Sequence, residues 1–183
     1  MKMFKKLMAV ALAGVMALVV LTGCASNALN SKEIVDCIND SIGSVAWLNA
    51  DMKLTATDEA DAAKLASVLK EYKAKEEYKD FTVEQLLEVN KVKQEIRKKL
   101  VAEGNTDMVL ISYAEVTDYQ SKYFGEAKNS MIASELMSMD HIKPIAGSNA
   151  EYEKTGTASL KEDTFGDDAY VFAVVRVSLK KEA

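Results

Sequence analysis

The chain opens on a segment whose composition separates it from everything that follows. Lys2, Lys5 and Lys6 give it a positive start, and residues 7–21 form a 15-residue apolar run interrupted only by Gly14. A membrane-spanning helix needs about 20 apolar residues, so the run is short for a permanent span. A basic start, a short apolar run and small residues in this order predict a secretory signal peptide over residues 1–23.

The end of this segment carries a chemical signature. Leu21-Thr22-Gly23-Cys24 joins small residues to a final cysteine, and with the upstream signal it resembles the lipobox of bacterial lipoproteins. The resemblance implies that a diacylglyceryl group is attached to the Cys24 thiol and that the chain is cleaved between Gly23 and Cys24. An ordinary cleaved signal and an uncleaved N-terminal anchor are the alternatives. We recognise no family for the rest of the chain.

The implied lipid is a sufficient anchor, because two acyl chains hold a protein on a membrane where one binds only marginally. The expected location is the extracytoplasmic face of a cell membrane. Ala25 stands where an aspartate commonly retains lipoproteins at an inner membrane, so the outer membrane is expected in a cell with two membranes. Residues 24–30 form a short polar tether, whose seven steps span at most about 25 Å.

The mature body is acidic and of single-domain size. Cleavage removes three lysines and no acid, so 20 of the 23 basic residues remain against 28 acidic ones. Such a body is not attracted to nucleic acid or to an anionic bilayer, which excludes nucleic acid as a partner. We expect one globular domain over residues 31–183, with the membrane contacted through the lipid on Cys24.

Only Cys37 would remain free after lipidation, so the domain is expected to fold without an internal disulfide. In a helix, Ile34, Ile38 and Ile42 form one stripe with Cys37 at its edge. This placement is typical of a half-buried thiol that behaves as a small apolar group. A reactive thiol or an intermolecular disulfide is the alternative, although no second cysteine completes a CxxC motif.

Apolar spacing predicts three helices in the first half of the chain. They cover about residues 31–48, about residues 58–78, and a segment that starts at Thr82, continues through Leu100 and is ended by Gly104-Asn105 after Glu103. The third has the clearest start, because Thr82 and Gln85 have the spacing of a capping box.

The second half is predicted to be mainly β structure. Residues 108–116 read as a strand with two apolar faces, typical of a central strand. This strand is followed by a helix over about residues 118–139, a loop around Pro144, and a hairpin of residues 152–161 and 169–179. The order predicts an α+β fold, with helices packed on one face of a small antiparallel sheet.

The chemistry-bearing residues do not assemble into a recognisable motif. His141 is the only histidine, and Asp140 is a poor orienting partner because adjacent side chains seldom point the same way. A Ser-His-Asp arrangement has no G-x-S-x-G motif to support it. Cysteine and histidine are too few for the usual zinc sets, and glycine-rich phosphate loops are absent. We therefore assign no catalytic residue, cofactor or metal.

Two further features have ordinary structural explanations. The acidic connector, residues 162–168, lacks the spacing of an EF-hand and is expected to be a solvated hairpin turn. Trp47, the single tryptophan, is expected to pack between elements, and an exposed aromatic for a ligand or partner is the alternative.

These observations favour a non-enzymatic, lipid-anchored protein of the cell envelope that acts as an interaction or accessory module. A small-ligand binder is the alternative, with a pocket between helices and sheet lined by Tyr113, Phe124 or Val174. A hydrolase whose acids cannot be singled out is the third hypothesis.

Overall fold

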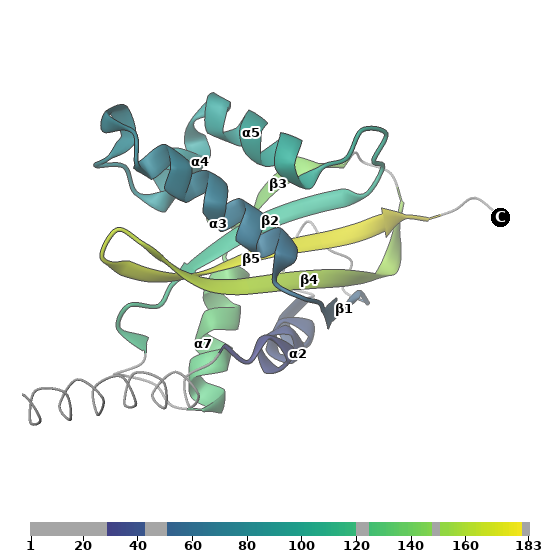
Figure 1. The fold of residues 1–183 in the computed structure, drawn as a ribbon. Helices are drawn as coiled ribbons and strands as arrows, with labels where there is room; N and C mark the ends of the chain where they lie inside the picture. Colours follow the sequence, from purple (N-terminus) through teal and green to yellow (C-terminus); the bar gives the residue numbers. More distant parts are fainter. Residues whose placement is uncertain (1–28, 43–50, 120–124, 148–150, 181–183) are drawn as a thin grey trace, which may run out of the picture.

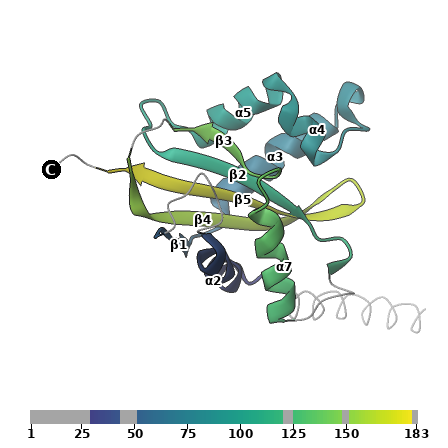
Figure 2. The same cartoon turned by 180° about the vertical axis from the view of Figure 1, so that it is seen from behind.

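A computed structural model describes residues 29–42, 51–119, 125–147 and 151–180 of the chain. The lipidation site Cys24, the cleavage position at Gly23 and the tryptophan Trp47 lie outside the described residues. Figure 1 shows helices on both sides of a central sheet, and Figure 2 shows the same arrangement from behind.

The sheet is mixed, and the prediction of a small antiparallel sheet is wrong. Its five strands lie in the order β1-β4-β5-β2-β3. Strand β1 pairs with β4 in parallel, whereas the other three pairings are antiparallel. The strands are β1 (Lys53–Ala56), β2 (Met108–Glu115), β3 (Lys143–Ala146), β4 (Tyr152–Phe165) and β5 (Asp168–Leu179).

Helices cover both faces of the sheet, which corrects the expectation of one covered face. On one side lie α2 (Ser31–Ser41) and α7 (Glu126–Leu136), which we call the α2/α7 face. On the other lie α3 (Ala60–Lys73), α4 (Val83–Glu88) and α5 (Asn90–Leu100), called the α3–α5 face. None of the described helices combines the length and apolarity needed to cross a membrane.

The strand β2 explains why both faces must be covered. Successive side chains of a strand point to opposite faces, and residues 108–114 are all buried. Leu110 and Ala114 join the core beneath α2 and α7, whereas Ile111 and Tyr113 join the core beneath α3 to α5. The prediction of an interior strand with two apolar faces is confirmed, because β2 lies between β5 and β3.

The C-terminal hairpin is confirmed but is longer than predicted. Strand β4 continues to Phe165 and β5 begins at Asp168, so most of the acidic connector is strand. The turn is reduced to Gly166 and Asp167, and Gly166 takes a positive φ of 69° that suits glycine. Asp163 of the connector pairs with Lys70 on α3, with 2.8 Å between Nζ and Oδ1.

The helix boundaries differ from the predicted ones at several points. The described part of the first helix ends at Ser41, and the second ends at Lys73 before a separate 3₁₀ turn, η2 (Glu76–Tyr78). The helix predicted over residues 118–139 is described as α7 over 126–136.

The segment from Thr82 to Leu100 forms two helices instead of one. The capping box of Thr82 and Gln85 is confirmed, with both of its hydrogen bonds present. Val89 interrupts the helix with an extended conformation, φ −73° and ψ 118°.

The predicted loop around Pro144 is instead the edge strand β3. An edge strand tolerates proline because its backbone need not donate on both sides.

The opposite edge of the sheet is closed by a side chain. The Asn39 Nδ2 donates to the Leu54 carbonyl at 2.9 Å, and the Leu54 N–H donates to the Asn39 Oδ1 at 2.7 Å. The Asn39 amide thus makes the two bonds that a further strand would make to Leu54. This pairing attaches α2 to the sheet edge.

Gly156 of β4 lies opposite Leu54, where the chains approach closely. A Cβ atom there would lie 2.7 Å from the Arg176 carbonyl oxygen and 2.9 Å from the Leu54 Cδ2. We expect Gly156→Ala to lower the free energy of unfolding by about 1–3 kcal/mol through overpacking. Urea unfolding followed by circular dichroism measures the loss, with the exposed Ser178→Ala on β5 as control. A Gly156→Ala curve that overlays the wild-type curve would contradict the expectation.

Candidate functional site

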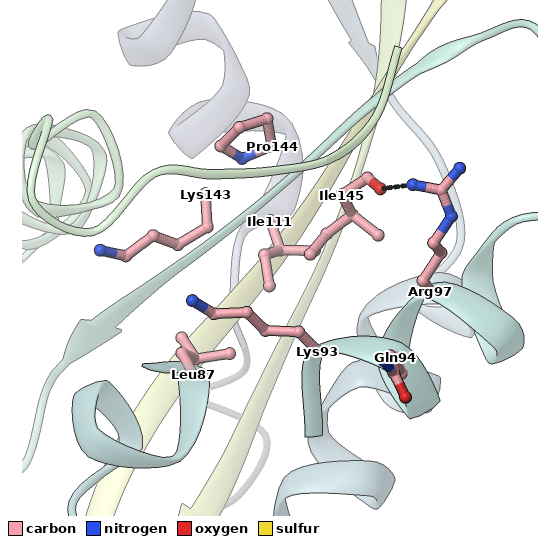
Figure 3. A pocket seen from close by; sticks show the side chains of 8 residues that line it. All are labelled: Leu87, Lys93, Gln94, Arg97, Ile111, Lys143, Pro144 and Ile145. Atoms are coloured by element: carbon pink, nitrogen blue, oxygen red, sulfur yellow. Dashed lines mark hydrogen bonds between the residues drawn. The ribbon is translucent and has the colours of Figure 1, made fainter. Parts of the chain in front are cut away.

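A pocket of about 350 Å³ opens between α4, α5 and the edge strand β3. Its volume lies within the range of about 300–1,000 Å³ that small-molecule sites occupy. Figure 3 shows the eight side chains that line it: Leu87, Lys93, Gln94, Arg97, Ile111, Lys143, Pro144 and Ile145.

The lining combines an apolar floor with positive charge. Leu87, Ile111 and Ile145 are buried apolar side chains, and three of the other lining side chains are cationic. Arg97 reaches from α5 to β3, where its Nη1 donates to the Ile145 carbonyl at 3.0 Å (Figure 3). This bond fixes the guanidinium at one end of the pocket. The charge contrasts with the acidic composition of the chain as a whole.

The two lysines of the lining converge on one carboxylate beside the pocket. The Lys93 Nζ lies 2.8 Å from the Glu88 Oε2, and the Lys143 Nζ lies 3.0 Å from the Glu88 Oε1. The hydrogen bonds from Lys93 and Lys143 hold the pKa of Glu88 below its ordinary value. The carboxylate is therefore ionised at neutral pH and shared between two ammonium groups.

The helix break at Val89 creates this arrangement. Residues five apart in a continuous α-helix are turned about 140° from each other and do not meet. Because Val89 is extended, Glu88 at the end of α4 can face Lys93 on α5. Strand β3 brings Lys143 to the same place from a distant part of the sequence. Three elements thus form one charged cluster.

The ligand-binding alternative placed its pocket between helices and sheet, and it stays a proposal. The pocket described above lies between α4, α5 and the sheet. Tyr113 and Val174 belong to the buried core of the same face and do not line it, and Phe124 lies outside the described residues. The residues that do line it carry no motif, because their proximity depends on the break at Val89 and on pairing of β3.

His141 is packed against an aromatic ring, and the structure does not place it in a catalytic arrangement. Its ring stacks on Tyr113, with 4.3 Å between ring centroids and 21° between planes. The His141 Nδ1 is buried and has no hydrogen-bond partner among the described residues, Asp140 included. Burial, reinforced by the acids nearby, raises the pKa of Tyr113 to about 12, so its hydroxyl stays neutral.

Cys37 occupies the half-buried position that the sequence predicted, at the edge of the core beneath α2 and α7. Burial, with the negative charges of Asp40 and Asp36, raises the pKa of its thiol above 9.0. Nucleophilic cysteines need a lowered pKa. Cys37 is therefore a poor candidate for a reactive thiol.

The pocket between α5 and β3 is the candidate site because of its volume, its buried apolar floor and its cationic side chains. Within the described ranges, no three His, Cys, Asp or Glu side chains are grouped so as to hold a metal ion. Comparison of the chain with protein-family models, with curated proteins and with solved structures found no match.

Proposed function

We propose that the protein is a lipid-anchored protein of the extracytoplasmic face of a bacterial membrane, with a non-enzymatic domain that acts as an interaction or accessory module. The observation that carries the proposal is the cysteine that ends the signal, Cys24 in Leu21-Thr22-Gly23-Cys24. The start of the folded region supports it. Helix α2 begins at Ser31, capped by the Asn30 side chain, so few residues separate it from Cys24.

Labelling with a radioactive fatty acid tests the anchor. The wild-type chain is expected to incorporate label, and Cys24→Ala is expected to lose it completely, because the thiol is the acceptor. Cys37→Ala is the matched control, since it removes the only other cysteine and should label like the wild type. Equal labelling of Cys24→Ala and the wild type would overturn the proposal.

Small-ligand binding is the second candidate function, favoured by the pocket between α5 and β3. The pocket is of ligand size and combines buried apolar side chains with converging cations. Such a mixture, with few charged groups over an apolar surface, is typical of sites that orient a small molecule. Small-ligand binding is compatible with a lipid anchor, and either proposal can be overturned without affecting the other.

A further inference from the structure

We propose that the pocket between α5 and β3 binds a small organic carboxylate that has an apolar body. The carboxylate is held between Lys93 and Lys143, and the apolar body lies over Leu87 and Ile111. The inference rests on the second candidate function, small-ligand binding, and names the chemical class of its ligand.

The geometry of the two lysines is already that of a carboxylate site. Their Nζ atoms approach the two different oxygens of the Glu88 carboxylate at 2.8 Å and 3.0 Å. These distances are those of charge-assisted hydrogen bonds. Glu88 thus marks the position and orientation that a ligand carboxylate would take. The two lysines carry one positive charge more than Glu88 neutralises, and Arg97 adds a third cation at the other end of the pocket.

Glu88 can be replaced by a ligand because its own hold is weak. Its side chain is 55% exposed, against 38% for Lys93 and 28% for Lys143. Exposed ion pairs contribute little to stability, since solvent screens them and two long side chains lose freedom. A ligand that also buries apolar surface gains an interaction that Glu88 cannot make. Exchange of one carboxylate for the other keeps both ammonium groups paired.

The floor of the pocket supplies the apolar interaction. Leu87, Ile111 and Ile145 are buried beneath the cavity. Figure 3 shows the lysines on the opposite side of Ile145 from Arg97, whose guanidinium is fixed by the Ile145 carbonyl. A volume of about 350 Å³ admits a chain of several carbons beyond the carboxylate. A bare inorganic anion would leave this surface unused.

A titration of the full-length protein in non-ionic detergent, observed by ligand NMR, tests the inference. Hexanoate is the probe, hexanamide is its neutral match, and protein-free detergent is the blank. Hexanoate is expected to bind. The dissociation constant of hexanamide is expected to be about tenfold higher, which is the effect of losing one charge-assisted hydrogen bond. Lys143→Met is expected to lower the affinity for hexanoate by a similar factor. Lys154→Met removes a lysine of β4 paired with Asp51 and should leave binding unchanged.

Glu88→Gln tests the proposed exchange between the Glu88 carboxylate and the ligand carboxylate. The neutral amide no longer competes for the two ammonium groups, so hexanoate is expected to bind about two- to fivefold more tightly, the usual range for an exposed ion pair. Thermal unfolding of each variant confirms that it is folded. If hexanamide binds as tightly as hexanoate, the inference that the ligand is a carboxylate is overturned, whereas small-ligand binding in the pocket is retained. If neither hexanoate nor hexanamide binds to the wild type or to Glu88→Gln, both the carboxylate ligand and small-ligand binding as a function are overturned. Fatty-acid labelling at Cys24 tests the lipid anchor independently of this result.

Discussion

Replacement of Phe172 by alanine is expected to lower the free energy of unfolding by about 3–5 kcal/mol, the usual cost of removing a buried phenylalanine. Phe172 is fully buried in β5, at the centre of the α3–α5 face. Its ring stacks on Tyr170 with 5.9 Å between centroids. Because helices cover this face, the surrounding side chains can close the cavity only in part.

Urea unfolding measured at equilibrium gives the value for Phe172→Ala directly. Met139→Ala is the matched control, since it also removes a large apolar side chain but from an exposed position. The control is expected to change the free energy of unfolding by less than about 0.5 kcal/mol. A loss below about 1 kcal/mol for Phe172→Ala would contradict the described core.

Arg176→Met is expected to cost about 2–4 kcal/mol, because it removes one partner of a largely buried ion pair. The Arg176 Nε donates to Asp61 on α3, and its Nη2 donates to the Leu100 carbonyl of α5 at 2.6 Å. The two charged side chains are only 25% and 21% exposed. One guanidinium thus ties β5 to two helices. Methionine would leave the Leu100 carbonyl without this donor and the Asp61 carboxylate with Lys64 as its remaining cation.

A double-mutant cycle with Asp61→Leu isolates the pair. The double variant is expected to be more stable than the two single losses predict, because neither member of the Arg176–Asp61 pair is then left without the other. Strict additivity would contradict a direct coupling between Arg176 and Asp61.

The same pair gives a dependence on pH. Burial alone would raise the pKa of Asp61, but the hydrogen bonds from Arg176 and Lys64 outweigh it and lower the pKa below 3.8. A carboxyl whose pKa is lower in the folded state stabilises the fold above its ordinary pKa. This contribution is lost as pH falls below 3.8 towards the folded value. The difference in stability between wild type and Arg176→Met should shrink in that acid range.

Local composition was sufficient to predict the long strands and the capped helix. The apolar stretches of β2 and β5, and the capping box of Thr82 and Gln85, specify their structure within a few residues. The four-residue strands β1 and β3 were missed because so short a segment is a strand only through its partner. Proline in β3 also resembles a loop signal until the strand is known to lie at an edge.

The candidate site could not be predicted for a related reason. Glu88, Lys93 and Lys143 are each ordinary surface charges in the sequence, and apolar spacing favours one helix through Val89. Only the break at Val89 and the pairing of β3 with β2 bring the three together. Short-range patterns therefore located the elements but not the contacts between them, because those depend on residues far apart in the chain.

The protection of the sheet edges has a consequence for how copies of the protein behave together. An unpaired edge strand is a template for polymerisation, because a strand of a neighbouring molecule can add to it. At β1 the Asn39 amide already occupies the Leu54 N–H and carbonyl, and at β3 Arg97 occupies the Ile145 carbonyl while Pro144 has no N–H to offer. In the anchored protein that we propose, copies would be concentrated in two dimensions on a bilayer. Crowding of that kind favours lateral aggregation. Because side chains already occupy backbone groups at both sheet edges, strand addition between crowded copies is disfavoured.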